Sequence, residues 1–543
     1  MQKETVPFRV KKTLTNRQPQ SMGNYINLGN TAFTISRNGE YVDKSGLIKV
    51  VNGTLNTENM FSCVTRSRRF GKSMAAKMLC AYYDQSCDSR HLFEDLLIAA
   101  DTSFEEHLNK YPVIYLDISD FVTRFQEESI VRTLDSELRK DLLKDFPDQT
   151  AEEGDDLMEF LTRVIESTGQ KFIFIIDEWD GILREFEGNI TVIDTYVNWL
   201  RRLFKGGLTA KVFAGVYMTG ILPIKKYNTQ SALNNFREYS MVDPGEMASF
   251  FGFTKEEVRI LAKKHNANFE ELEKWYDGYH IGDELSMFNP NSVMMAVTRH
   301  RCTSYWAGTG AYNIVSRYIT MNFKGLKDDI LSLLSGGRTR VKTSKFGNDL
   351  NIITDKNDVL TVLIHLGYLS YDWNKKQCYV PNLEVADELS NALEDTEWTN
   401  VVEALQQSEE LLEATIRGNE EYVARAIDAV HSDHTSILSY NDENSLACVI
   451  SLAYYYARND YFIDREMPTG YGYADLVFTP RGNVAKPALI IELKQGHSAE
   501  EAIQQIKERK YVEKIRQRTS DILLIGINYD EKSKKHTCII EKA

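Results

Sequence analysis

The sequence predicts an α/β protein: a parallel sheet with helices on both faces, a mostly helical middle region and a C-terminal α/β unit. Short β-rich runs such as YPVIYLDIS and KFIFIIDEW alternate with longer helical patterns from Phe61 to about Ile224, which is typical of a parallel sheet covered by helices. Helical patterns punctuated by Gly and Pro dominate from about 240 to 430. After Ser436 a helix, two strands, a helix and a last strand follow one another.

These patterns divide the chain into several domains, because 543 residues are too many for one hydrophobic core. We expect an irregular lead over 1–25 and a first α/β domain over 26–240. A helical lid or connector over 241–436 follows, and a second α/β domain occupies 437–543.

The composition is that of a globular protein, with 43% apolar and 26% charged residues. The chain has no run of about 20 apolar residues that could span a bilayer, and its first residues, MQKETVPFRVKK, lack the apolar core of a signal peptide. We therefore expect a cytoplasmic protein without a membrane partner. The seven cysteines form no CxxC pair, so neither a disulfide framework nor a structural zinc site is indicated. A net charge of −14 means that nucleic-acid binding has to be argued from a local site.

The segment TRSRRFGKS lies between an apolar strand and an amphipathic helix, where a phosphate-binding loop belongs. In such a loop the backbone N–H groups bind phosphates, a lysine offsets their charge and a hydroxyl holds magnesium. Gly71, Lys72 and Ser73 fit these roles, although Arg66 replaces the usual first glycine. The neighbouring loop residues are further candidate nucleotide contacts: Arg68, Arg69 and Phe70.

Two further strands carry polar residues at their carboxyl ends. The apolar run KFIFII ends in Asp177 and Glu178, as expected for a buried parallel strand. In ATPases with a phosphate loop, such an aspartate reaches the metal and the glutamate polarises the attacking water. The strand KVFAGVYMTG ends in Thr219, which either senses the terminal phosphate or caps the following turn. The cofactors expected here are ATP and Mg²⁺.

A second constellation lies near the C-terminus. Asp475 is in one predicted strand, and Glu492 and Lys494 share one face of the next, because side chains alternate along a strand. Two carboxylates can hold Mg²⁺ or Mn²⁺, and the lysine can offset charge at a scissile phosphate. We expect like-charge repulsion to raise the pKa of a carboxylate here when metal is absent. Glu443 on the preceding helix and Gln505 on the following one are candidate fourth and fifth members.

The motifs resemble those of a bacterial and archaeal family that joins an AAA-ATPase-like domain to a C-terminal domain of the PD-(D/E)XK nuclease superfamily. They follow in order through nearly the whole chain, including YVDKSGLI, TRSRRFGKS, FIIDEWD, MTGILPI, WYDGYHIG, FNPNSV, HLGYLSY, GYADLVF, IIELK and QIKERKY. Family members also carry arginines in the loop, whereas Ser67 stands where proline is frequent. The resemblance implies an ATP site at Gly71, Lys72, Ser73, Asp177 and Glu178, and a nuclease-like core at Asp475, Glu492 and Lys494.

Two functions stay open at this point. The first is an ATP-regulated nuclease that cuts DNA rather than RNA, in defence or in the upkeep of mobile elements. The second is an ATP-dependent switch or scaffold whose C-terminal domain binds nucleic acid or a partner without cutting. A DNA motor is disfavoured, since no arginine finger can be assigned and Arg237 is better explained as a surface charge. Homo-oligomer formation is left open.

Overall fold

The computed structural model of the chain divides into two compact units. The first comprises Met1–Thr65 and Gly71–Tyr239, and the second comprises Arg66–Phe70 and Ser240–Ala543. The residues described are 24–125, 129–149, 156–224, 226–227, 230–231, 233–282, 285–306, 311–321, 323–394, 399–434, 449–469, 472–480, 486–509, 511–516, 519 and 521–543.

The first unit is built around a five-stranded sheet in the order β2-β3-β4-β1-β7, in which every neighbouring pair is parallel. The strands are β1 (Phe61–Thr65), β2 (Val113–Asp117), β3 (Phe172–Asp177), β4 (Phe213–Gly220) and β7 (Arg237–Tyr239). Since the strands are parallel, their carboxyl ends meet at one edge. A short antiparallel pair, β5 (Lys226–Tyr227) and β6 (Gln230–Ser231), lies outside this sheet.

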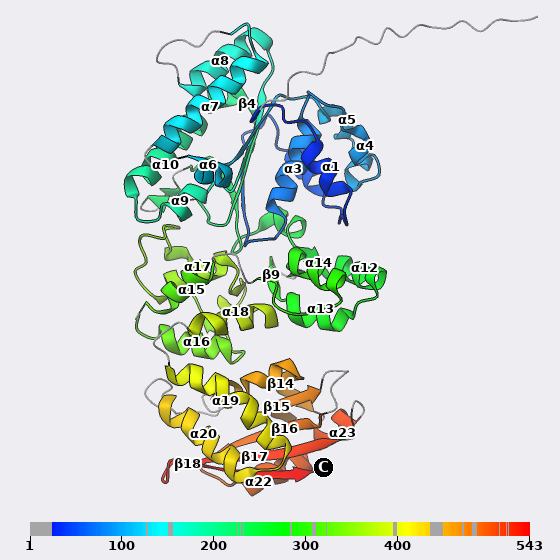
Figure 1. Cartoon of the computed structure of the whole chain (residues 1–543), viewed down its shortest axis with the longest axis vertical. Helices are drawn as coiled ribbons and strands as arrows, with labels where there is room; N and C mark the ends of the chain where they lie inside the picture. The colour runs from blue at the N-terminus through cyan, green and yellow to red at the C-terminus, as the bar shows by residue number, and fades with distance from the viewer. Residues whose placement is uncertain are drawn as a thin grey trace, which may run out of the picture. The chain divides into compact units, whose positions relative to one another are not determined.

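Helices cover both faces of this sheet, which is why β3 is buried along its whole length. Its residues Phe172, Phe174 and Ile176 share a core with residues of the layer formed by α7, α8 and α10, so the alternating residues of β3 face α3 on the other side. Figure 1 shows α1, α3, α4 and α5 on one side of the strands and α6 to α10 on the other. Their bounds are α1 (Thr31–Arg37), α2 (Gly46–Asn52), α3 (Lys72–Tyr83), α4 (Arg90–Phe93), α5 (Phe104–His107), α6 (Ile118–Arg124), α7 (Ile130–Asp145), α8 (Leu157–Thr168), α9 (Gly181–Glu185), α10 (Ile190–Phe204) and α11 (Thr209–Val212).

The middle part of the second unit is mostly helical, as expected. Its helices are α12 (Lys255–His265), α13 (Phe269–Tyr276), α14 (Pro290–Arg299), α15 (Ala311–Ile319), α16 (Leu326–Leu334), α17 (Lys356–Leu366) and α18 (Leu383–Glu394). Local sequence sets several of their ends: Thr254 and Glu257 form a capping box at α12, and Gly367 ends α17 with φ 92°.

Two small antiparallel sheets accompany these helices. One sheet contains β12 (Ser370–Asp372) and β13 (Gln377–Tyr379), and β11 (Thr339–Arg340) pairs with β13. The other sheet, β8 (Phe253–Thr254), β10 (Leu285–Phe288) and β9 (Tyr279–Ile281), was not predicted. Strands of two to four residues are too short to show a periodic pattern.

The C-terminal part contains a five-stranded mixed sheet in the order β14-β15-β16-β17-β18. The pair β16–β17 is parallel and the other pairs are antiparallel, so the chain needs a crossover between β16 and β17, which α22 and α23 supply. The elements are α19 (Thr399–Ile416), α20 (Glu420–His434), β14 (Tyr461–Thr469), β15 (Gly472–Pro480), β16 (Ala488–Gln495), α22 (Ala499–Glu508), α23 (Tyr511–Arg516), β17 (Ile522–Asp530) and β18 (Lys535–Lys542). The expected fold class is thus confirmed, although β14 and β18 were not predicted.

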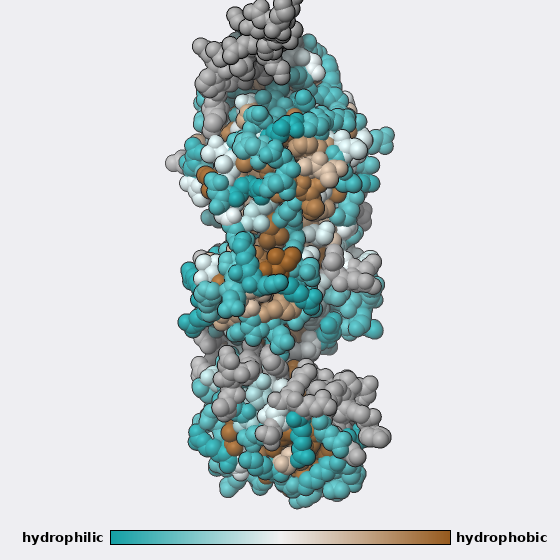
Figure 2. Space-filling model, turned by 90° about the vertical axis from the view of Figure 1, so that its right-hand side faces the viewer, coloured by the Kyte–Doolittle hydropathy of each residue, from teal (hydrophilic) through white to brown (hydrophobic). Residues whose placement is uncertain are grey.

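The surface in Figure 2 is mostly hydrophilic, with apolar residues gathered in small patches. Large apolar side chains that stay exposed include Leu97, Ile190, Ile260 and Trp373, and they come from separate elements. Within the described part of the chain, no helix combines the length and the apolar character needed to span a membrane.

Close packing of α22 on β17 requires a glycine at position 526. A Cβ atom there would lie 2.3 Å from the carbonyl oxygen of Ala499 and 3.2 Å from Cβ of Ala502. We expect Gly526→Ala to lower the free energy of unfolding by roughly 1–3 kcal/mol, because a backbone atom must move to make room. Urea unfolding would measure this, with Gly347→Ala as the control, because a Cβ at Gly347 meets nothing within 4 Å. Equal stabilities of the two variants would contradict this packing.

Candidate nucleotide and metal sites

The N-terminus of α3 has the local structure of an anion-binding turn. Gly71 precedes the helix in the left-handed conformation (φ 89°), which favours glycine, and no side chain caps the helix there. The N–H groups of the first turn therefore have no side-chain acceptor at the cap and are suited to bind a phosphate. Lys72 begins the helix and is 4% exposed, and Ser73 follows it half-buried.

Carboxylates at the edge of the sheet offset the charge of this lysine. Burial lowers the pKa of Lys72, whereas the negative charges of Glu178 and Asp177 act in the opposite direction. A buried ammonium group needs such counter-charges, and phosphate groups could supply them instead. The donor set of Gly71, Lys72 and Ser73 thus fits a nucleotide phosphate.

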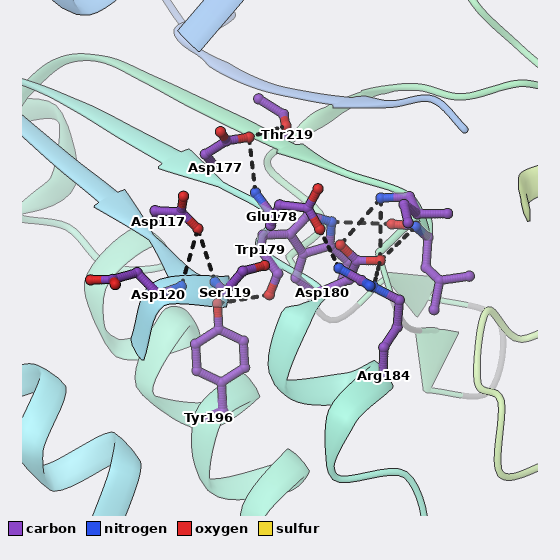
Figure 3. Close-up of polar contacts among 12 residues, drawn as sticks. Asp117, Ser119, Asp120, Asp177, Glu178, Trp179, Asp180, Arg184, Tyr196 and Thr219 are labelled. Atoms are coloured by element: carbon purple, nitrogen blue, oxygen red, sulfur yellow. Dashed lines mark hydrogen bonds and ion pairs between the residues drawn. The ribbon is translucent and has the colours of Figure 1, made fainter. Parts of the chain in front are cut away.

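Asp177 is fully buried at the carboxyl end of β3 and accepts hydrogen bonds on both oxygens. Thr219 Oγ1 donates to Oδ1 at 2.9 Å, and the N–H of Glu178 donates to the same atom at 3.1 Å. Tyr115 OH donates to Oδ2 at 3.3 Å. Figure 3 shows Asp177 beside Thr219 at the ends of their strands. The structure thereby brings Asp177 and Thr219 together through the hydroxyl of Thr219, whereas a role of Thr219 in sensing phosphate stays a prediction.

Asp117 is a further carboxylate at this edge that sequence reasoning missed. It ends β2 directly opposite Asp177 in the parallel register, and it caps α6 by accepting from the N–H of Ser119 at 3.0 Å. Burial, followed by the charge of Asp177, raises the pKa of Asp117 to about 6. The available signal was that YPVIYLDIS, like FIFIIDEW, is an apolar run ending in an aspartate.

Glu178 follows in a left-handed backbone conformation (φ 52°), which is uncommon for a residue with a side chain. Its carboxylate pairs with Arg184 of α9 rather than with Asp177 (Figure 3). Arg184 also pairs with the fully buried Asp180 at 3.0 Å. The sequence identified Glu178 but gave no sign of its arginine partner.

The first half of the loop, Arg66–Phe70, folds as part of the second unit. The Arg66 side chain is buried, with its guanidinium carbon 5.5 Å from the centre of the Phe251 ring. The Phe70 side chain is 1% exposed and packs edge-on against Tyr279. In this segment Arg68 is half-buried and Arg69 is exposed, and Arg69 donates to the carbonyl of Tyr305 at 2.9 Å. That Arg68, Arg69 and Phe70 contact nucleotide stays a prediction.

The C-terminal sheet brings Asp475 and Glu492 together. Leu476 of β15 pairs with Ile491 of β16 in antiparallel register, which places the preceding Asp475 beside the following Glu492. Asp475 Oδ2 accepts a hydrogen bond from the N–H of Leu493 at 2.8 Å. The hairpin expected from sequence therefore has the predicted geometry.

Glu492 lies on the face of β16 that is covered by α22. Ile490 of the same strand belongs to a core cluster with residues of α22, whereas Ile491 and Leu493 belong to the core on the opposite face. Lys494 Nζ is 3.7 Å from Glu492 Oε1, and Gln505 Nε2 of α22 donates to the same oxygen. Glu492, Lys494 and Gln505 thus converge as predicted.

The environment of Glu492 suits a divalent cation. The residue is 1% exposed, and no described donor reaches its Oε2. Burial, followed by the charge of Asp475, raises the pKa of Glu492 to about 8, against the opposing charges of Lys494 and Arg509. The expected rise is therefore present, with burial rather than repulsion as its first cause. A cation bound to Oε2 and Asp475 would satisfy both groups.

Glu443 lies outside the described residues, and among the residues that are described no group of three or more His, Cys, Asp or Glu could hold a metal. The described part of the site is therefore a carboxylate pair with Lys494 and Gln505. Arg509, exposed just after α22, was missed by sequence reasoning. Its only signal was its place in the basic segment QIKERKY.

A parallel sheet with a phosphate-loop-like turn and an acidic edge, followed by a mixed sheet with an Asp…Glu-x-Lys core, defines a protein with an ATPase-like domain and a nuclease-like domain. Residues 28–229 match the family described as Predicted AAA-ATPase. Residues 441–538 match the PD-(D/E)XK nuclease superfamily. The chain thus carries an AAA-ATPase-like domain and a C-terminal PD-(D/E)XK nuclease superfamily domain, and the resemblance seen in the sequence is confirmed. No curated protein matches the chain.

The raised pKa of Glu492 predicts a pH-dependent stability of the metal-free protein. Its ordinary value is 4.5 and its folded value is about 8, so between these values unfolding releases a proton that the folded state retains. The free energy of unfolding should fall as pH rises from about 4.5 to about 8 through this group. Glu492→Gln should remove that dependence and make the protein more stable than wild type at pH 8.

Urea unfolding in EDTA at pH 5 and pH 8 measures this effect. The exposed Glu500 of α22 gives a matched control, Glu500→Gln, which should behave as wild type. A Glu492→Gln protein with the same difference between the two pH values as wild type would show that this carboxyl group is not buried in solution.

Proposed function

We propose that this protein binds and hydrolyses ATP and cleaves DNA phosphodiester bonds with Mg²⁺ or Mn²⁺ in its C-terminal domain, under nucleotide control. The observation that carries the proposal is the Glu492 carboxylate, buried beside Asp475 with one oxygen that no described donor reaches. A carboxylate buried beside a second carboxylate destabilises a domain unless hydrogen bonds, a proton or a cation relieve it. Such a pair is therefore better explained by metal chemistry than by folding.

The residues of the C-terminal site can be given roles. Asp475 and Glu492 would hold the metal ion, which supplies positive charge to a phosphate. Lys494, 3.7 Å from Glu492, can stabilise charge that develops at the scissile group or orient the attacking water. Gln505 fixes the orientation of Glu492 through its hydrogen bond to Oε1. A DNA substrate would accord with a role in defence or in the upkeep of mobile elements.

Some residues of the ATP site would bind the nucleotide, and others would act in its hydrolysis. The N-terminus of α3 with Lys72 would bind the phosphates, and Ser73 and Asp177 would hold Mg²⁺. Glu178 would accept a proton from the attacking water. Thr219, which already contacts Asp177, would respond to the terminal phosphate. Nucleotide control of the C-terminal domain is part of the proposal and is tested separately below.

Two substitutions separate ATP binding from hydrolysis. Lys72→Ala should abolish ATP binding, measured by equilibrium titration, because it removes the cation at the start of α3. Glu178→Gln should retain binding and lower kcat by about 100-fold or more, since an amide cannot act as a base. Lys77→Ala, on the same helix, is the matched control. Unchanged ATP affinity of the Lys72→Ala protein would show that this turn is not the phosphate loop.

Cleavage should require metal and each residue of the C-terminal core. We expect plasmid and single-stranded DNA to be cut in Mg²⁺ or Mn²⁺, and Asp475→Ala, Glu492→Ala and Lys494→Ala each to eliminate cutting while ATP binding persists. Glu500→Ala is the control on the neighbouring helix. Addition of ATP should change the cleavage rate of wild type but not of the Lys72→Ala protein.

Each part of this experiment has its own outcome that would contradict the proposal. Cutting that survives chelation, or that the Glu492→Ala protein performs as well as wild type, would rule out this site. Metal-dependent DNA binding without cutting would instead favour an ATP-dependent switch or scaffold. A cleavage rate that ATP does not alter would remove nucleotide control alone.

A further inference from the structure

Arg184, the ion-pair partner of Glu178, has no part in the proposed steps of ATP binding and hydrolysis. The Oε2 atom of Glu178 is bound by Arg184, whose side chain is 13% exposed, and this contact involves one of the two carboxylate oxygens. Figure 3 shows the Glu178 carboxylate directed to the guanidinium of Arg184 and away from Asp177. One carboxylate oxygen is thus fixed by Arg184, and the contact does not involve the other oxygen.

A second carboxylate, Asp180, fixes the orientation of Arg184. The Nε of Arg184 donates to Asp180 Oδ2 at 3.0 Å. Asp180 is fully buried and also accepts from the N–H groups of Ile221 at 3.2 Å and Leu222 at 3.0 Å. Those two residues follow β4 directly, so the guanidinium is held by the backbone just beyond Thr219.

Hydrogen bonds and close packing hold the backbone around Asp180 and Leu222 in place. The Trp179 indole Nε1 donates to the carbonyl of Leu222 at 3.1 Å, and Tyr196 OH donates to the carbonyl of Trp179 at 2.9 Å. A Cβ atom at Gly220 would lie 2.5 Å from Trp179 and 2.6 Å from Asp180. Next to these contacts the backbone of Glu178 lies in the left-handed region (φ 52°). Such strain persists only where neighbouring structure imposes it.

We propose that Arg184 is a positioning residue for ATP hydrolysis: it binds Glu178 Oε2 so that Oε1 is presented to the water that attacks the terminal phosphate. The inference rests on the proposed ATPase function and adds a residue to it. Among the neighbouring carboxylates, Glu178 does most to counteract the lowering of the pKa of the buried Lys72. Without Arg184 the side chain would be drawn toward Lys72 when nucleotide is absent, and would lack a fixed orientation when phosphate is present.

The test compares Arg184→Gln, Arg184→Lys, Glu178→Gln and the Arg184→Gln/Glu178→Gln double variant in the full chain. Arg184→Gln should lower kcat by about 10-fold to 100-fold, with KM and the equilibrium Kd for ATP within about twofold of wild type. Arg184→Lys should restore part of the rate because it keeps one charged donor. In the Glu178→Gln background, loss of Arg184 should cause no further decrease, because both residues act in the same step.

Thermal unfolding of each variant, together with the Kd for ATP, shows whether the fold and the binding turn persist. Equal losses of kcat in both backgrounds, a weakened Kd for ATP, or a kcat of the Arg184→Gln protein at or above wild type would each overturn the positioning role. If wild type itself does not hydrolyse ATP, the proposed function fails and this inference fails with it. If wild type hydrolyses ATP and the Arg184→Gln protein does so equally well, only the inference fails.

Discussion

Both candidate sites depend on the cost of burying a carboxylate at the edge of a sheet. Asp177 is fully buried and Glu492 is 1% exposed, and a charge removed from water must be offset by hydrogen bonds, by a counter-charge or by a proton. The neighbouring residues of each site can be understood as different solutions to this one constraint.

At the parallel sheet, several hydrogen-bond donors offset the charge of each buried carboxylate. Asp177 has the hydroxyls of Thr219 and Tyr115 and a backbone N–H, and Asp180 has two backbone N–H groups and Arg184. At the mixed sheet the described partners of Glu492 are Gln505, a more distant Lys494 and the backbone of Asp475. Its charge is therefore poorly offset in the protein alone, which is the arrangement expected where a cation completes the site.

Sequence predicted the parts of these sites that follow from strand periodicity. The continuous apolar run before Asp177 indicated a strand buried on both faces, and the alternation of Glu492, Leu493 and Lys494 fixed which side chains share a face. It did not predict that Asp117 lies beside Asp177, because that depends on the order of strands in the sheet. Nor could it predict the contact of Glu178 with Arg184, which depends on the left-handed backbone at Glu178. The strands β14 and β18 were missed because charged and polar residues interrupt the apolar pattern in YFIDREMPT and KHTCIIEK, as is common at sheet edges.

The assignment of Arg66–Phe70 to the second unit has a consequence for dissecting this chain. The polypeptide passes between the units after Thr65, after Phe70 and after Tyr239, so a single cut near residue 239 does not yield two complete folding modules. An N-terminal fragment would carry the buried side chains of Arg66 and Phe70 without Phe251 and Tyr279, against which they pack. Truncation would thus expose the ring of Phe70 and leave Arg66 without the ring it packs against. Both residues directly precede the turn at Gly71, whose phosphate binding such a fragment would be made to study.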